Sequence, residues 1–356
     1  DVVAVDRRRS GESGSSSAGT SRIFRLGHAD AGHVGLAAQA LDLWGDLERR
    51  SGRVLIARRG LIERGEPALA VATALGERDV AHALLEDADA RNRFPELADR
   101  PGEPILFHEA AGTILARPAL EVQARLAGRA GAELREFEEA RHIEQAADHV
   151  VVRTSRRALE ADVAVVCAGA ASLRVLEPVG ITPPLVVEAI QTTFFSCNRG
   201  AFERPLLIDW YPAADRATIY GMPMPEVGYK LGLVASRRPA SDVDASKPDL
   251  DEVATLARRA RLEYPGLGPA LRTEACPITT TPDGDFVLDR VGRVVIACGC
   301  NGQAFKFSPL IGELLASLAE GRSLDGQARR FRLDRAGLAG PARTFSDAVR
   351  TNFSAG

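Results

Sequence analysis

The sequence predicts an α/β fold in which an inserted, mainly antiparallel-sheet domain interrupts the first domain. Residues 162–168 and 293–298 are each apolar throughout after a first charged residue, Asp162 or Arg293, which is typical of parallel strands buried on both faces. Between them, strand patterns dominate as far as residue 233, which favours a second, sheet-rich unit. The chain has 356 residues, which is long enough for two domains.

The composition argues against several classes of function. The 45 basic and 48 acidic residues nearly balance, so the charge gives no reason to expect nucleic acid as a partner. No apolar run approaches the ~20 residues of a membrane-spanning helix. The five cysteines are scattered, which predicts free thiols in a reducing, cytoplasmic compartment. No histidine neighbours the Cys298 and Cys300 pair, so we expect no metal site.

The first predicted strand covers residues 2–5 and ends at Asp6. An acidic residue at the end of the second strand of a βαβ unit binds the ribose of an adenine dinucleotide, although a loop aspartate is also commonplace. The matching glycine fingerprint would lie about 20 residues upstream, before Asp1. We therefore expect that a strand, loop and helix of roughly 30 residues precede this chain.

The remaining elements follow from the spacing of apolar residues. Helical spacing predicts helices over residues 33–50, 118–129 and 251–264, the last stopped by Pro265. Alternation predicts a hairpin over residues 54–64 and strands over 132–137 and 150–153.

The segment RVVIACGCNGQAFKFSP, residues 293–309, combines a strand, two glycines and a helix start. We expect Ser308 to cap this helix, with Pro309 at its first position, and the helix to run to about Glu320. A helix start attracts negative charge, so Lys306 could serve an anionic ligand there. An ordinary strand–turn–helix connection with a solvated lysine is the alternative.

Lysine is rare in this chain. Only Lys230, Lys247 and Lys306 interrupt an otherwise all-arginine set of basic residues. Because the pKa of lysine is tunable and that of arginine is not, a lysine here marks a place where a compact charge is needed. Lys247 lies in a polar loop and is expected to be solvated, whereas the other two lie in apolar, glycine-bearing segments.

Four motifs together resemble the monomeric sarcosine oxidase family, which includes N-methyltryptophan oxidase and belongs to the D-amino-acid-oxidase-like superfamily. TSRIFR (20–25) resembles its D-T-R-[IL]-I-R segment, and IYGMPMPEVGYKLG (219–232) its Y-Y-G-[FL]-P…K-[IL]-G strand pair. ACPITTTPDGDFVLD (275–289) resembles its C-x-Y-T-x-[TS]-P-D-x-x-F-[IV]-[IL]-D run, and GCNGQAFKFSP (299–309) its G-x-S-G-H-G-F-K-[FL]-[SA] motif. The motifs occur in the family's order, and the resemblance covers nearly the whole chain.

This resemblance implies a Rossmann-like FAD-binding domain formed by residues 1–55, 115–183 and 283–356. Residues 56–114 and 184–282 would form the substrate domain. The implied activity is oxidation of a small secondary amine or imino acid, with hydride transfer to FAD and reoxidation by O2, giving an imine and H2O2. We expect a cytoplasmic monomer or weak dimer.

The same resemblance implies the residues around FAD. Cys276 would carry the flavin covalently, with a buried structural cysteine as the alternative reading. Arg22 would lie near the isoalloxazine ring. The other expected cofactor-binding residues are Asp6, Ser16, Ser17, Gly169, Gly299, Gly302, Gln303, Ala304 and Lys306.

For the substrate, the resemblance implies that Arg25 and Lys306 hold a carboxylate. Tyr220 and Gln303 would line the pocket, although a core tyrosine is an equal alternative for Tyr220. Lys230 would lie over the flavin face opposite the substrate, where its charge stabilises developing superoxide. A lysine that merely ends a strand is the alternative. The six histidines are scattered along the chain, and we expect them to be surface or core residues rather than catalysts.

Three positions depart from the family pattern. Val234 and Gln303 stand where the family usually has histidines, and Ile278 replaces a tyrosine. These changes make the pocket less polar, so a bulkier N-alkyl amino acid or a cyclic imino acid fits better than sarcosine.

Three other functions stay open at this point. A flavin dehydrogenase would pass its electrons to another acceptor, against which Lys230 argues. A catalytically silent, truncated homologue would act as a binding protein. A flavin hydroxylase would need an NAD(P)H site, and no sequence feature demands one.

Overall fold

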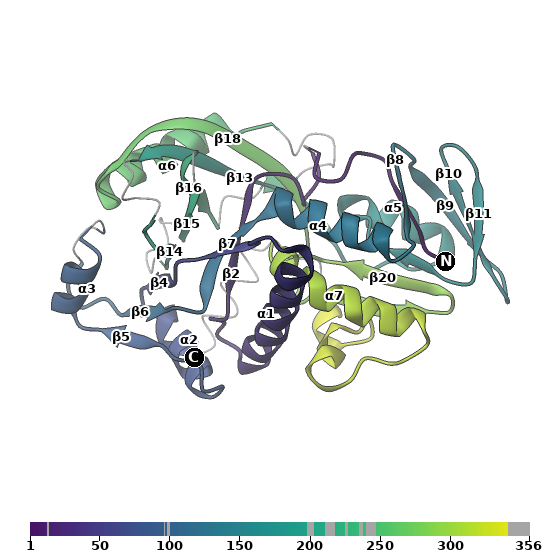
Figure 1. Ribbon diagram of the computed structural model, residues 1–356, viewed down its shortest axis with the longest axis horizontal. Helices are drawn as coiled ribbons and strands as arrows, with labels where there is room; N and C mark the ends of the chain where they lie inside the picture. The colour runs from purple at the N-terminus through teal and green to yellow at the C-terminus, as the bar shows by residue number, and fades with distance from the viewer. Residues whose placement is uncertain are drawn as a thin grey trace.

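The computed structural model describes residues 1–12, 14–95, 97, 100–197, 203–210, 218–224, 227–234, 238–239 and 247–340. The molecule is elongated, with a large sheet at one end and several small sheets at the other (Figure 1). The mixed α/β class is confirmed. None of the helices in the described ranges is long and apolar enough to span a membrane.

The large sheet has nine strands in the order β17-β13-β16-β15-β14-β4-β6-β5, with β18 paired to β13. Its strands are β4 (Leu61–Arg64), β5 (Ala83–Leu85), β6 (Ile105–His108), β13 (Val186–Cys197), β14 (Leu206–Asp209), β15 (Ile219–Met224), β16 (Gly228–Leu233), β17 (Arg238–Pro239) and β18 (Leu267–Thr280). Only the β14–β4 pair among them is parallel, so the predicted, mainly antiparallel sheet is confirmed.

The small sheets contain the predicted parallel strands. β1 (Val3–Asp6) pairs in parallel with β8 (Glu133–Glu136), and β12 (Ala164–Val166) pairs in parallel with β20 (Val294–Cys298). The other strands of the small sheets are β2 (Ser21–Arg25), β3 (Ile56–Arg58), β7 (Ala111–Leu115), β9 (Ala140–Gln145), β10 (Val150–Thr154), β11 (Ala158–Ala161) and β19 (Val287–Val291). The division into an FAD-binding and a substrate domain stays a prediction.

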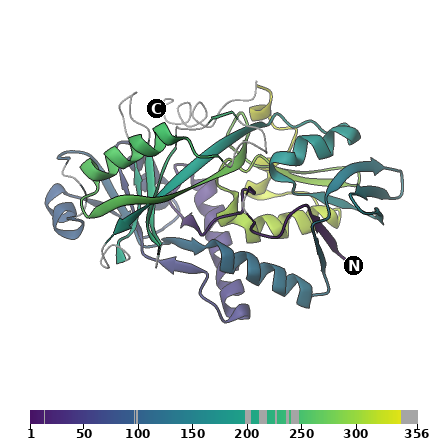
Figure 2. The ribbon, with the colours of Figure 1, turned by 90° about the horizontal axis from the view of Figure 1, so that it is seen from above.

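The helices are α1 (Ala31–Ser51), α2 (Pro67–Gly76), α3 (Asp87–Arg93), α4 (Ala116–Arg129), α5 (Ser172–Leu176), α6 (Leu250–Glu263) and α7 (Ala304–Ala319). Short 3-10 turns occur at Gly169–Ala171, Glu177–Val179, Gly326–Phe331 and Ala336–Leu338. The helices predicted in α1, α4 and α6 are confirmed. The Asp249 side chain caps the start of α6, and Tyr264, just before Pro265, is the C-cap at its end. The helix lies across the long strand β18 (Figure 2).

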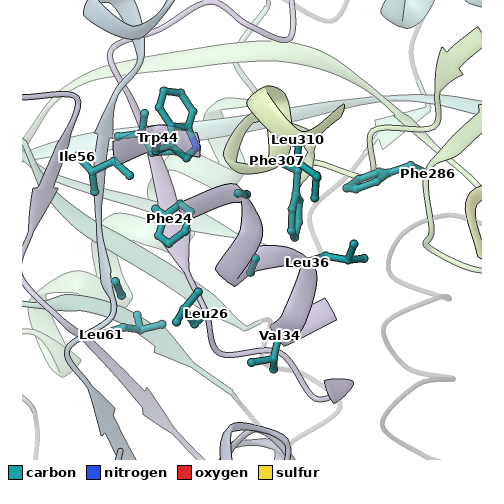
Figure 3. Packing of buried hydrophobic residues seen from close by; sticks show 14 of the residues in the cluster. Phe24, Leu26, Val34, Leu36, Trp44, Ile56, Leu61, Phe286, Phe307 and Leu310 are labelled. Carbon is teal, nitrogen blue, oxygen red and sulfur yellow. The ribbon is translucent and has the colours of Figure 1, made fainter. Parts of the chain in front are cut away.

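The main core lies where α1 and α7 pack together beside β2. Phe24, Val34 and Phe307 are among its buried side chains (Figure 3). Trp44 of α1 is also buried there, and its indole Nε1 donates a 2.8 Å hydrogen bond to the carbonyl of Lys306. This contact ties the first turn of α7 to the centre of α1 and so fixes the position of Lys306.

The predicted hairpin over residues 54–64 is wrong. β3 pairs with β7, whereas β4 pairs with β6 and β14 in the large sheet. The amides of Arg59 and Gly60 both donate to the carbonyl of Ala111, so the link joins two sheets instead of closing a turn. Gly60 is left-handed there, with φ of 73°.

Two further predictions are wrong in part. The strand over residues 162–168 shortens to β12 and is not buried on both faces, because Val165 is 46% exposed. The last helix begins at Ala304 rather than after Ser308, whose buried hydroxyl has no hydrogen-bond partner among the residues that the structure describes and so does not cap the helix. Pro309 therefore lies inside the helix, close enough to its start to cost little hydrogen bonding.

Candidate active site

Three segments that are distant in sequence meet beside Cys276. This cysteine lies on β18, where it faces Ile190 of β13 in the register. The hydroxyl of Ser16 donates a 2.6 Å hydrogen bond to the carbonyl of the next residue, Pro277. Gly169 is also close, since a Cβ there would lie 4.0 Å from the Ser16 hydroxyl. The fold therefore brings three of the predicted cofactor-binding residues together.

Arg22 and Lys230 approach the same place. The Arg22 guanidinium donates to the carbonyl of Ser16 at 2.7 Å and lies 5.3 Å from the centre of the Phe305 ring. Lys230 is only 5% exposed, and its Nζ lies 3.3 Å from the carbonyl of Ser21. Burial, with the charge of Arg22, lowers the pKa of Lys230 to about 8.

A left-handed turn precedes α7. The φ angles of Gly299, Asn301 and Gly302 are 65°, 50° and 68°. At Gly299 a Cβ would lie 2.3 Å from the side chain of Thr281, so the turn requires glycine. The Asn301 side chain donates to the carbonyl of Gly299 at 2.6 Å and thereby stabilises the turn.

The turn leads into Gln303 and Lys306. Gln303 is the residue before the helix, and Ala304 is its first residue. Lys306 is 6% exposed, and its Nζ donates to the Gln303 side chain at 3.3 Å. Burial and the charge of Arg25 hold the pKa of Lys306 well below its ordinary value.

Arg25, at the end of β2, belongs to a buried ionic group. Its Nη1 lies 3.3 Å from Oε1 of Glu63, a side chain with no exposed surface. Glu63 also accepts a 3.0 Å hydrogen bond from Trp210 Nε1, and His108 Nε2 lies 3.8 Å from it. Burial opposes the charge of Glu63, but Arg25, His108 and Trp210 hold the pKa of its carboxyl below its ordinary value.

His28 completes this region. It is 7% exposed, and its Nε2 has no hydrogen-bond partner among the described residues. Its ring stacks on His33 at 5.5 Å. Burial, and then the charges of Arg25 and Lys306, hold the pKa of His28 well below its ordinary value, so His28 is neutral and both cations act on it.

Tyr220 lies on the same face of the large sheet as Glu63. The register pairs Tyr220 with Ile208, and Ile208 with Glu63, so the three side chains form a row across β15, β14 and β4. The Tyr220 ring lies over Gly232, where a Cβ would be 2.5 Å from it. Lys230 faces the same side, because it pairs with Met222 of β15.

The fold does not bring every predicted residue into this region. Asp6 lies at the exposed end of β1 in the two-stranded sheet, where its carboxylate accepts from the amide of Arg8 at 2.9 Å. Ser17 is partly buried in the loop that carries Ser16.

Sequence reasoning missed Glu63, His108 and Trp210. The available signal was the pair of adjacent charges, Glu63 and Arg64, which directly follow the apolar residues Leu61 and Ile62. In the predicted hairpin both charges would be solvated, whereas β4 lies in the middle of the large sheet between β6 and β14, where both are buried.

Comparison with known proteins identifies the family. A family model described as FAD dependent oxidoreductase (DAO) matches residues 1–318. The chain belongs to this FAD-dependent oxidoreductase family. It is 30% identical over 327 residues to a monomeric sarcosine oxidase of Streptomyces avermitilis, covering 85% of this chain and 83% of that protein. An N-methyl-L-tryptophan oxidase of Salmonella newport is 24% identical over 333 residues, covering 89% and 87%.

Solved structures of an amino acid oxidase and of a proline dehydrogenase have the same fold. NikD, an unusual amino acid oxidase essential for nikkomycin biosynthesis, superposes with a TM-score of 0.84 at 23% identity, covering 93% of this chain and 90% of that one. L-proline dehydrogenase from P. horikoshii superposes with a TM-score of 0.83 at 18% identity, covering 96% and 92%. The expected resemblance is confirmed: this is an FAD-dependent oxidoreductase of the sarcosine oxidase type that acts on CH–NH groups.

The buried positive charges of the described residues fit the binding of FAD. Lys230 and Lys306 are buried amines, and neither forms an ion pair with a carboxylate within the described part of the chain. Buried cations of this kind require an anionic partner, which the electron-rich ring edge and phosphates of FAD supply.

Proposed function

We propose that this chain oxidises a small secondary amine or imino acid that carries a carboxylate, with FAD as cofactor and O2 as electron acceptor. The observation that carries the proposal is the pair of cations Arg25 and Lys306 in buried surroundings beside the neutral His28. Such a pair recognises a carboxylate with one guanidinium and one point charge. The sarcosine oxidase name of the Streptomyces relative supports an amine bearing a carboxylate.

FAD, when bound, supplies the group that accepts hydride from the carbon next to the nitrogen. Cys276 is proposed as its covalent attachment, with Ser16, Gly169 and Arg22 beside it. The turn at Gly299 and Gly302 and the helix start at Ala304 would hold it from the other side. Asp6, Ser17, Gln303 and Lys306 complete the proposed set.

The remaining residues would orient the substrate. Tyr220 lines the pocket from β15, and Gln303 fixes the amine of Lys306 by accepting its hydrogen bond. A neutral secondary amine needs no general base for hydride loss, so positioning and charge carry the rate. The charged form of Lys230 would assist the reaction with O2. The imine then hydrolyses in water.

Oxygen consumption tests this function. The purified protein is supplied with N-methyl and cyclic imino acids under air, and peroxide is measured. Peroxide formed in step with the amine consumed is the expected result. Turnover only with an artificial dye would instead indicate a dehydrogenase, and a colourless protein would indicate a silent homologue.

Acid precipitation tests the covalent attachment at Cys276. The yellow colour should remain with the wild-type pellet, because a thioether survives denaturation. It should leave the pellet of Cys276→Ser. Cys197→Ser, which changes another partly buried cysteine, serves as the control and should keep its colour. If the colour leaves the wild-type pellet, the flavin is bound but is not attached through a thioether.

A further inference from the structure

The Arg25–Glu63 pair gives the proposed carboxylate site an unusual charge balance. Two cations, Arg25 and Lys306, lie beside the same small region. His28 follows Arg25 by three residues, and its ring lies 5.9 Å from the ring of Phe307, the residue after Lys306. The charges of Arg25 and Lys306 both lower the pKa of His28. A single carboxylate, Glu63, lies against one of them at 3.3 Å. Arg25 and protonated Lys306 are positive and Glu63 is negative, so these three groups together carry one net positive charge. His28 is neutral, and the neighbouring His33 has its own counter-charges in Asp30 and Asp285.

The Glu63 side chain lies on the face of the large sheet that contacts Arg25. Successive residues of a strand point to opposite faces, and β4 carries a buried charge on each. Arg64 turns away to pair with Asp209 at 2.6 Å, in a group that also includes Tyr264. Glu63 turns toward Arg25 and lies in the row that contains Tyr220.

The contacts of Glu63 hold its carboxylate in place. Oε1 faces Arg25 and Oε2 accepts from Trp210, and the side chain has no exposed surface. The backbone of Gly27 passes so close that a Cβ there would lie 2.8 Å from both Glu63 Oε1 and His108 Nε2. Such a carboxylate cannot swing out to water when a ligand enters.

We infer that Glu63 is a specificity-determining residue, which restricts the site to substrates with one carboxylate by cancelling one of its two positive charges. The inference rests on the proposed function, in which Arg25 and Lys306 bind the substrate carboxylate. A second carboxylate on the substrate would enter a dry site without a counter-charge and would be repelled by Glu63. Removal of the Glu63 charge should therefore admit dianions.

The test measures the binding of two probes that cannot be oxidised, acetate and malonate, to the holoenzyme by calorimetry. Wild type should bind acetate more tightly than malonate. In Glu63→Gln the ratio of the two affinities should shift toward malonate by about tenfold or more, since like charges in a buried site are strongly unfavourable. Asp209→Asn alters a buried arginine–carboxylate pair on the other face of the same sheet, so it should leave the ratio unchanged.

A second pair of variants, Arg25→Gln and the double variant Arg25→Gln/Glu63→Gln, tests the same charge balance independently of the single Glu63→Gln variant. Arg25→Gln leaves no net positive charge and should bind acetate weakly. Adding Glu63→Gln returns the site to one positive charge, from Lys306, and should recover acetate binding about tenfold. Removal of both partners of a buried pair is tolerated better than removal of one.

The outcomes separate the two proposals. An unchanged acetate-to-malonate ratio in a folded Glu63→Gln, or no recovery in the double variant, overturns the role of Glu63 while the carboxylate site stands. Failure of wild type to bind acetate overturns the carboxylate site itself, and the inference with it.

Discussion

At the residue scale, the two lysines in apolar segments are both buried. Lys230 and Lys306 are 5% and 6% exposed, whereas Lys247 is exposed, as its polar loop predicted. Burial lowers the pKa of both buried amines. The lowered pKa makes the charge of Lys230 sensitive to pH near neutrality, which arginine could not provide.

Lys230→Met should slow the reaction with O2 by roughly 100-fold, the effect of losing one preorganised charge. In wild type, the rate with O2 should fall as the pH rises through about 8, because Lys230 then loses its proton. The variant should show no such fall. The rate of flavin reoxidation is measured by rapid mixing of the reduced protein with oxygen. A second measurement follows the bleaching of the flavin by substrate without oxygen.

The anaerobic bleaching should change little in Lys230→Met, because hydride transfer does not need this charge. Lys247→Met removes an exposed lysine and should behave like wild type in both measurements. Normal reaction with O2 in Lys230→Met would remove this residue from the mechanism.

At the element scale, the β15–β16 pair determines how the pocket wall is packed. Two glycines of this pair meet side chains on opposite faces. A Cβ at Gly232 would lie 2.5 Å from the Tyr220 ring on the proposed pocket face. A Cβ at Gly221 would lie 2.6 Å from Leu231 on the other face. Glycine is therefore required twice, for packing rather than for backbone conformation.

Gly232→Ala should push the Tyr220 ring toward the proposed pocket and raise KM about tenfold, equivalent to about 1.4 kcal/mol. Overpacking should also lower the free energy of unfolding by about 1–3 kcal/mol. Steady-state kinetics and urea unfolding measure the two effects. Gly221→Ala should destabilise the fold to a similar extent without changing KM. Equal KM values for the two variants would contradict a pocket position for Tyr220.

At the scale of the whole molecule, the large sheet separates two buried ionic groups. One face carries Glu63 and His108, beside which Arg25 of β2 lies, and the other face carries Arg64 and Asp209. A buried charge without a partner is strongly destabilising, so each group needs its full set of residues. These residues come from segments that are far apart in sequence, which only the assembled sheet brings together.

Much of the fold could be predicted from local pattern. The helices α1, α4 and α6 have clear apolar spacing, and Pro265 ends α6 in the expected place. Helical spacing does not reveal where a helix begins when a glycine turn precedes it. For that reason α7 starts at Ala304, before the Ser308–Pro309 signal. Nor does alternation reveal which strand pairs with which, so β3 and β4 were wrongly joined.

Four motifs in a fixed order were enough to predict the family without coordinates, and the matching family model confirms it. It also indicated Lys230, Lys306 and Cys276 through their rarity and their motifs. Only the tertiary structure revealed the Glu63, His108 and Trp210 group around Arg25, and with it the charge of the site. The physical reason is that local residue patterns report propensity and burial, whereas net charge at a site depends on which distant side chains the fold places within a few ångströms.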